Sequence, residues 1–305
     1  ARDVKWMLTI CAPRILKQDG RRVKELGLDG EVIERCKKLI HDALKGENRL
    51  TRVEIMQLLD DAGISPAGQR GYHILWYLAQ AGLICLGPRE GNQQTYVLID
   101  EWVPGAEELP REEALGRLAT RYVTSHGPAT TADFARWIGT TLADAKLGVS
   151  RAEPALHREM IAGVEYWLPA GGGFPPAHAG AGPLRGSTVF LLPGFDEFIL
   201  GYKDRDAVLD PAHAPLVVPG SNGVFKPIVV VDGQVAGTWM RTIKKGGVEI
   251  AVHLFPPQTR KAAATGAAPA PDVSDRSLHD QLMAEAHRYA EFLEMPLLGV
   301  NVVGC

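Results

Sequence analysis

The chain has 305 residues, of which 46 % are hydrophobic and 23 % are charged, so a packed core is expected and global disorder is excluded. Its net charge of −3 argues against a protein that holds nucleic acid by bulk charge alone. No apolar run reaches the roughly 20 residues of a membrane helix. Four scattered cysteines without a C-x-x-C pair argue against a disulfide framework or a zinc site, and they fit a reducing cytoplasm.

The charge is unevenly distributed along the chain. Residues 1–52 hold 13 Lys and Arg against 8 Asp and Glu, a net charge of +5, so the remainder carries −8. A local basic face can bind DNA on a mildly acidic protein, and the alternative is that these side chains only solvate helices. The first ten residues are typical of an amphipathic helix. Because the first residue is Ala, we expect a fragment that lacks a segment upstream.

Residues 31–104 predict a first complete domain. Apolar residues recur at helical spacing over 31–46, and Thr51 with Glu54 forms a capping box that starts a second helix. Ser65-Pro66 is expected to open a third helix, which runs to a glycine at position 82.

Two strand-like segments follow this third helix, over 83–86 and 95–99. Helix, helix, short turn, helix and hairpin is the order of a winged helix-turn-helix.

The same order recurs over residues 105–170. The segment 111–125 is typical of a helix, Thr130 and Thr141 are expected to cap two more, and a hairpin is expected over 155–168. The likeness lies in the order of elements and not in residue identity.

Residues 171–186 are rich in Gly, Pro and Ala and predict a linker, and 187–305 predict a C-terminal domain with a terminal helix over 279–294. Residues 258–278 are expected to be flexible. Alternating strands bounded by turn residues indicate a small antiparallel sheet or barrel; they span 188–192, 223–231, 234–242 and 248–255. The fold class is therefore α+β, with tandem winged helix-turn-helix units followed by a small β domain.

A cationic hairpin is the first candidate for binding. Asp232-Gly233 predicts a tight turn, and the next turn carries Arg241, Lys244 and Lys245 before two glycines. Lys and Arg at a hairpin tip suit contact with phosphate, and the alternative is an ordinary solvated turn.

The third helix of the first domain is the second candidate. Gln69, Arg70 and His73 lie near its start, and the spacing places Gln69 and His73 on one face. In a lone winged helix that face enters the major groove, whereas in tandem arrays it can pack internally. Arg89 in the wing is expected to reach a phosphate.

A charged cluster and the histidines are the remaining candidates for chemistry. The charged cluster is consistent with an acid–base pair or with a salt-bridged turn that fixes the sheet. It consists of Asp196, Glu197, Asp204 and Arg205. The nine histidines show no metal-ligand spacing, so no metal site is expected.

Several stretches together resemble a known family. One reads Leu192-Pro-Gly-Phe-Asp-Glu-Phe-Ile-Leu-Gly-Tyr202, followed by Asp204-Arg205. The other segments that carry the likeness are 6–14, 68–73 with 96–98, 125–130 with 133–134, 222–225 and 232–239. In order and spacing the chain resembles the winged-helix DNA glycosylases of the AlkZ/YcaQ type over nearly its whole length.

The resemblance implies three tandem winged helices and a C-terminal β-barrel around a DNA-binding channel, with residues 1–30 as the remnant of the first winged helix. It implies hydrolysis of the N-glycosidic bond of N7-alkylated purines, and of some interstrand crosslinks, in double-stranded DNA. It implies that the reaction needs neither a metal nor an organic cofactor. The hairpin at Arg241, Lys244 and Lys245 corresponds to one that the family presses against DNA.

One feature of the family is missing. Its catalytic signature is Gln, an apolar residue, then Gln or Asp, and no Gln-x-Gln or Gln-x-Asp occurs in this chain. The sequence therefore assigns no catalytic residue. The alternative function is a non-enzymatic winged-helix DNA-binding or regulatory protein, and a hydrolase using Asp196 and Glu197 is a third hypothesis.

Overall fold

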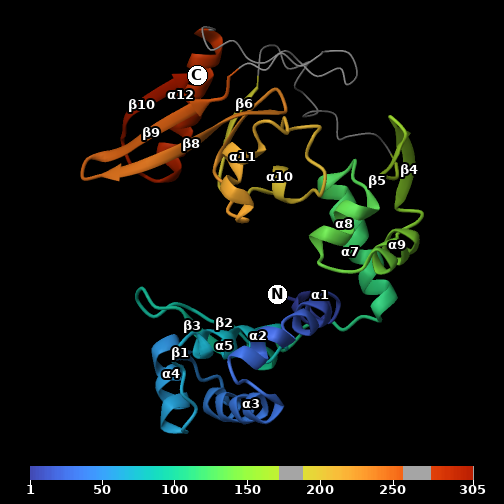
Figure 1. Ribbon diagram of the computed structural model, residues 1–305, viewed down its shortest axis with the longest axis vertical. Helices are drawn as coiled ribbons and strands as arrows, with labels where there is room; N and C mark the ends of the chain where they lie inside the picture. The colour runs from blue at the N-terminus through green and yellow to red at the C-terminus, as the bar shows by residue number, and fades with distance from the viewer. Residues whose placement is uncertain (172–187, 257–275, 305) are drawn as a thin grey trace. The chain divides into compact units, whose positions relative to one another are not determined.

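A computed structural model describes residues 1–171, 188–256 and 276–304 and divides the chain into two compact units, Ala1–Ala170 and Gly171–Cys305 (Figure 1). Each unit is described by itself. The predicted linker lies, except for its first residue, outside the described residues, and so does most of the segment 258–278.

The first half of unit 1 is a helical domain closed by a small sheet. Its elements are α1 (Val4–Gln18), α2 (Gly20–Glu25), α3 (Gly30–Leu44), β1 (Leu50–Thr51), α4 (Arg52–Asp61), α5 (Arg70–Gln80), β2 (Ile84–Leu86) and β3 (Thr95–Leu98). The strand order is β1-β3-β2, and both pairings are antiparallel. A cluster of fully buried aliphatic side chains, among them Ile40, Leu59 and Leu78, joins α3, α4 and α5. We interpret this order and pairing as a winged helix-turn-helix.

The start of α5 differs from the sequence prediction. The prediction that Ser65-Pro66 opens the helix is wrong, because the helix begins at Arg70. Gly68 and Gln69 have φ values of 60° and 72°, and this left-handed backbone cannot continue a right-handed helix.

The second half of unit 1 repeats the plan. Its elements are α6 (Ile99–Trp102), α7 (Arg111–His126), α8 (Thr131–Trp137), α9 (Leu142–Arg151), β4 (Leu156–Ile161) and β5 (Val164–Pro169). Thr130 and Asp133 form a capping box on α8, and Thr141 caps α9. An isolated bridge between Ala129 and Trp167 of β5 takes the place that β1 holds in the first half.

Helix α1 ties the two halves of unit 1 together. Trp6 is 1 % exposed, and the guanidinium groups of Arg117 and Arg121 lie 5.7 and 5.3 Å from its ring centre. Asp3 accepts hydrogen bonds from Trp6 and from Arg121 of α7. The residues before α3 therefore form part of the core of this unit.

Unit 2 is built on one five-stranded sheet. Its elements are β6 (Val189–Leu192), α10 (Glu197–Leu200), α11 (Ala214–Val217), a 3₁₀ turn η1 (Pro219–Ser221), β7 (Ile228–Val231), β8 (Gln234–Lys244), β9 (Gly247–Leu254), α12 (Arg276–Phe292) and β10 (Leu297–Gly304). The strand order is β10-β9-β8-β7-β6. All pairings are antiparallel except that of β10 with β9.

The two faces of this sheet are covered differently. Helix α12 packs on one face through Leu278, Leu282 and Ala286, and the segment with α10 and α11 covers part of the other. Of the alternatives sheet or barrel, the described residues form an open sheet, in which β6 and β10 each have one neighbour. The predicted strand over 223–231 begins only at Ile228, and β10 was not predicted.

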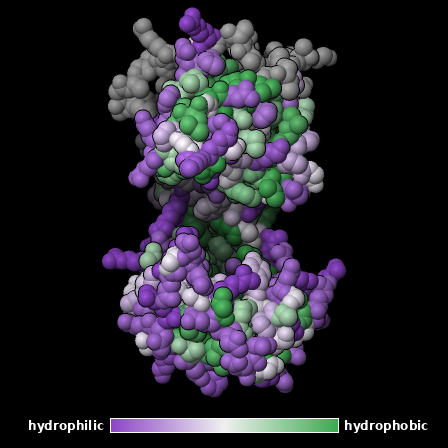
Figure 2. Space-filling view, turned by 90° about the vertical axis from the view of Figure 1, so that its left-hand side faces the viewer, coloured by the Kyte–Doolittle hydropathy of each residue, from purple (hydrophilic) through white to green (hydrophobic). Residues whose placement is uncertain are grey.

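Figure 2 shows one side of the molecular surface, on which apolar side chains lie scattered among polar ones.

Candidate nucleic-acid interface

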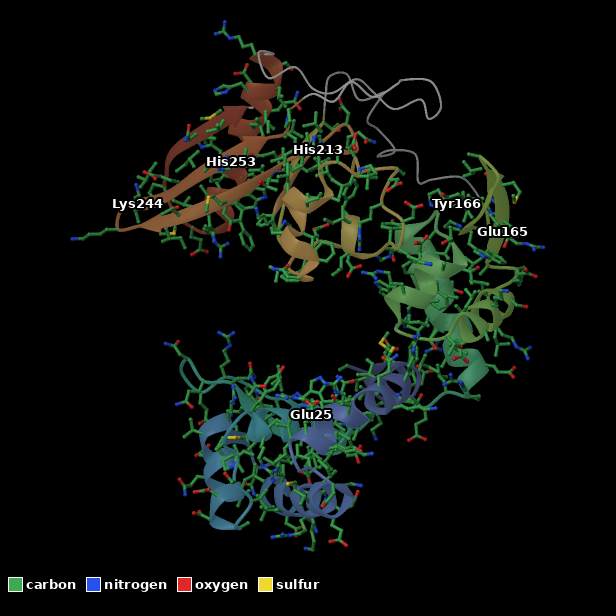
Figure 3. The ribbon with its side chains drawn as sticks, in the orientation of Figure 1. Glu25, Glu165, Tyr166, His213, Lys244 and His253 are labelled. Carbon is green, nitrogen blue, oxygen red and sulfur yellow. The ribbon has the colours of Figure 1, made fainter. Side chains whose placement is uncertain are left out.

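The β8–β9 hairpin is shaped by two turns of unit 2. Asp232 and Gly233 have φ values of 48° and 77°, which confirms the predicted tight turn between β7 and β8. Beyond it, Lys244 pairs with Gly247, so Lys245 and Gly246 alone form the turn between β8 and β9. Figure 3 shows Lys244 at the far end of this hairpin.

The three predicted cations occupy different positions on the hairpin. Arg241 lies within β8, not in the turn, and its guanidinium donates a hydrogen bond to the Tyr289 hydroxyl of α12 and lies 5.7 Å from that ring centre. Lys244 forms a 2.6 Å ion pair with Glu249 of β9. For Lys245, in the turn, no ion pair is found with any residue in the described parts of the chain.

Tyr289 is a residue that the sequence did not single out. Its ring also meets Trp239 of β8 edge-on, with ring centres 4.9 Å apart. Tyr289, held by Trp239, therefore fixes the orientation of the Arg241 guanidinium. A cation that is already oriented loses little freedom when it binds a ligand. The one sequence signal for Tyr289 was its place on the apolar side of α12.

The predicted residues of α5 are separated by the fold. His73 is 8 % exposed, its Nε2 lies 2.6 Å from Asp19 Oδ2, and its ring stacks on Trp76. Arg70 donates hydrogen bonds to the carbonyls of Ser65, Leu26 and Gly27. Both side chains hold α5 against the segment around α2, and the burial of His73 leaves it little surface for a ligand.

Gln69 and Arg89 remain at the surface. Gln69 accepts a 2.7 Å hydrogen bond from Arg22 of α2. Arg89 lies exposed between β2 and β3, next to Glu90, which is paired with Arg49 at 2.8 Å. The wing therefore presents Arg89 beside a neutralised pair.

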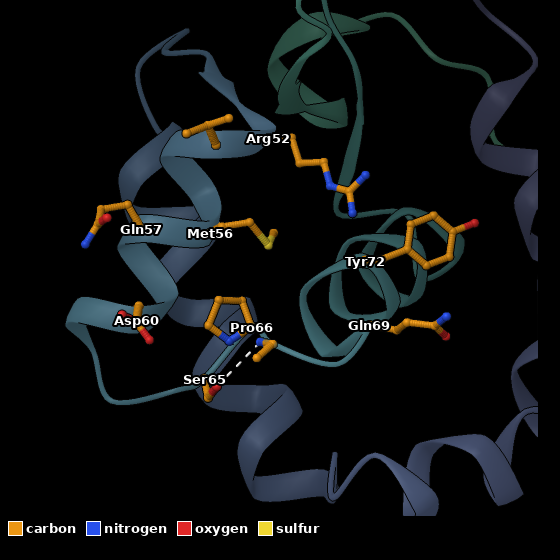
Figure 4. A pocket seen from close by; sticks show the side chains of 10 residues that line it. Arg52, Met56, Gln57, Asp60, Ser65, Pro66, Gln69 and Tyr72 are labelled. Carbon is orange, nitrogen blue, oxygen red and sulfur yellow. Dashed lines mark hydrogen bonds between the residues drawn. The ribbon is translucent and has the colours of Figure 1, made fainter.

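A groove of about 760 Å³ lies between α4 and α5 (Figure 4). Tyr72 is 56 % exposed at its rim, and the Arg52 guanidinium lies 5.7 Å from the Tyr72 ring centre. Neither residue was predicted from the sequence. The sequence contains two weak signals for them: Arg52 directly follows the N-cap residue of α4, and Tyr72 directly precedes the buried His73.

The acidic cluster of unit 2 has structural contacts. Asp196 accepts a hydrogen bond from the backbone N–H of Phe198 and caps α10, and Asp204 accepts one from the N–H of Asp206. Arg205 lies 5.0 Å from the ring centre of Phe225 and donates to the carbonyl of Ile199. These contacts favour a role in fixing the turns of this unit.

No group of three or more metal-ligating side chains comes together in the described residues. Across those same residues, no helix is both long and apolar enough to cross a membrane.

Comparisons with known proteins match this fold. A sequence model described as DNA glycosylase AlkZ-like matches residues 1–292. The chain belongs to the AlkZ-like DNA glycosylase family. A relative from Streptomyces sahachiroi, the interstrand DNA cross-link repair glycosylase, is 29 % identical over 180 residues. That alignment covers 54 % of this chain and 45 % of the relative, so it spans about half of either protein.

The fold of this AlkZ-like chain also matches a solved structure. The structure of Streptomyces sahachiroi DNA glycosylase AlkZ aligns with a TM-score of 0.71 and 22 % sequence identity, over 97 % of this chain and 76 % of that one. At this identity the likeness shows the fold, a mixed helix and sheet architecture with small antiparallel sheets. It confirms the α+β class expected from the sequence.

Proposed function

We propose that this protein binds double-stranded DNA and hydrolyses the N-glycosidic bond of N7-alkylated purines, including those in interstrand crosslinks. The observation that carries the proposal is the AlkZ-like family match over residues 1–292. An alkyl group on N7 leaves a positive charge on the purine and weakens its bond to the sugar. The protein then has to stabilise an oxocarbenium-like sugar and to position a water molecule.

The β8–β9 hairpin is the proposed grip on the DNA backbone. Lys245 and Lys244 are exposed, and Arg241 is exposed and contacts Tyr289, so one hairpin carries three surface cations. Contacts from Lys and Arg to phosphate position a protein on the duplex without reading its sequence. In unit 1, Gln69, Arg89, Arg52 and Tyr72 form the proposed secondary contact surface, and His73 is left out of it.

A base-excision assay tests the proposal. The purified chain is incubated with a duplex that carries one N7-methylguanine, then half of the sample is heated in alkali, and both halves are run on a denaturing gel. We expect alkali-dependent cleavage at the lesion above a protein-free control, because the abasic product breaks in alkali.

A second candidate function is non-enzymatic DNA binding, for regulation or for architecture. It is favoured by the absence of a Gln-x-Gln or Gln-x-Asp sequence from the 305 residues. If a folded preparation binds the duplex but gives no cleavage above the control, the glycosylase proposal fails and this second function stands.

A further inference from the structure

Strand β10 forms an open edge of the sheet in unit 2. It pairs in parallel with β9 from Leu297 to Gly304, and among the described strands none lies on its other side. In the parts of the chain that the structure describes, no backbone group of residues 297–304 bonds outside that pairing. Such an edge presents a row of N–H and C=O groups that fit one kind of ligand, a further β-strand.

The side chains of β10 do nothing to block such pairing. Natural edge strands are commonly protected by charged side chains, by proline or by being short. Residues 297–304 read Leu-Leu-Gly-Val-Asn-Val-Val-Gly and contain neither a charge nor a proline. The only irregularity of register lies at its start, between Leu297 and Gly299. The opposite edge, β6, is only four residues long, and α12 packs against it.

Apolar groups surround this open edge. Leu298 and Val303 are 47 % and 43 % exposed, and Phe292, which ends α12 just before the strand, is 79 % exposed. Each of these side chains leaves apolar surface in water that a second strand and its neighbours would cover. Asn301 is exposed near the middle of the strand.

The geometry points to a two-fold homodimer in which β10 pairs antiparallel with β10 of a second copy. A pairing centred on Asn301 sets Val300 opposite Val302 of the second copy, and by symmetry the reverse. Val300 and Val302 both pack on the α12 side of the sheet. This register therefore keeps both α12 helices on one face of a continuous sheet, as the two-residue alternation of strands requires.

A second copy suits this edge because the edge is uncharged. A charged edge strand would place like charges opposite each other in a two-fold pair, and such pairs destabilise a sheet. Pairing of one strand buries less than the roughly 1,200 Å² at the lower end of stable interfaces. We therefore expect a weak dimer whose population rises with concentration.

Charge substitution at the two-fold axis tests this pairing. Sedimentation velocity of the full chain over a hundredfold range of concentration should show the shift from monomer to dimer. Asn301→Asp and Asn301→Lys each place like charges at the axis, so each variant alone should dimerise at least tenfold more weakly. An equimolar mixture of the two should recover the dimer, because opposite charges then meet at the axis.

Matched controls separate this effect from misfolding. Thr242→Asp and Thr242→Lys make the same changes at an exposed site on β8, inside the sheet, and should leave dimerisation unchanged. A dimer recovered in the mixture also shows that both Asn301 variants fold. The inference is overturned if the unmodified chain stays monomeric over the whole range. It is equally overturned if each Asn301 variant dimerises as the unmodified chain does, or if the mixture fails to recover the dimer.

Discussion

At the scale of single residues, the cations of the β8–β9 hairpin are not equivalent. Lys244 shares its charge with Glu249 at 2.6 Å, and both side chains are about half exposed, at 51 % and 43 %. An exposed pair of this kind contributes only ~0–1 kcal/mol to stability, so it can be broken at little cost to the fold. Its larger effect is on the charge that Lys244 offers to a phosphate.

We predict that Glu249→Gln strengthens binding to duplex DNA. Removing the carboxylate frees Lys244 and lowers repulsion of the backbone, which should raise affinity about two- to fivefold, in line with an interaction worth ~1 kcal/mol at most. Fluorescence anisotropy with a labelled duplex measures this. Glu34→Gln, which removes the same charge from a pair with Lys37 on α3, is the control. Equal affinities for the Glu249 variant and the unmodified chain would show that this part of the hairpin does not meet DNA.

At the scale of elements, the hairpin depends on one glycine. A Cβ added to Gly247 would lie 2.1 Å from the carbonyl oxygen of Pro296, and the φ of Gly247 is 153°. Gly247→Ala should therefore destabilise the protein by ~1–3 kcal/mol, because backbone atoms must move apart. Gly246→Ala is the matched control, since its Cβ would meet nothing nearer than a Leu298 methyl group at 3.9 Å. Urea unfolding compares the two, and equal losses would contradict the close approach.

The stability contributed by the contact between α1 and α7 is expected to depend on pH. The pKa of Asp3 is held below its ordinary value, mainly by the hydrogen bond from Arg121 and also by that from Trp6. Because the folded pKa is the lower one, this carboxylate contributes stability above its ordinary pKa of about 4 and loses that contribution as pH falls through the folded pKa.

We therefore predict that Asp3→Asn is less stable than the unmodified chain at pH 7 and that the difference shrinks below about pH 4. Urea unfolding at several pH values measures it. In an Arg121→Met background the same substitution should have less effect at pH 7. A difference that is constant from pH 7 to pH 3 would rule out the Asp3–Arg121 pair as its source.

At the scale of the whole molecule, each of the two units holds its own core. Buried clusters join α3, α4 and α5 in unit 1, and other clusters lie on the two faces of the sheet in unit 2. Residues 1–170 expressed alone should therefore unfold cooperatively with urea and show a dispersed amide NMR spectrum. An amide NMR spectrum with little dispersion would show that unit 1 needs unit 2 to fold.

The capping-box signals in the sequence were reliable, whereas the Ser65-Pro66 signal was not. Thr51 with Glu54 and Thr130 with Asp133 place α4 and α8 correctly, because a capping box is closed within four residues. The start of α5 was misplaced because two left-handed residues override Ser65-Pro66.

Partners far away in the sequence decided the remaining differences. His73 contacts Asp19, which lies 54 residues earlier in the chain, and the spacing of residues within α5 does not reveal this contact. Strand β10 was missed because it pairs in parallel with β9 across the whole of α12. The contact of Arg241 with Tyr289 was missed because the two residues are 48 positions apart. Contacts of this range come from packing and not from local pattern.

The salt dependence of duplex binding measures whether Arg241, Lys244 and Lys245 bind phosphates of the DNA backbone. Anisotropy titrations at several salt concentrations compare the unmodified chain with a variant in which all three are Ala. The control replaces Arg35, Lys37 and Lys38 of α3, which match the set in type and number.

We predict that the hairpin variant loses affinity and that its slope of log K against log salt falls by about 0.9 for each phosphate that the protein no longer neutralises, while the control changes little. Unchanged affinity and slope in the hairpin variant, with the protein folded, would contradict the claim that this hairpin holds DNA.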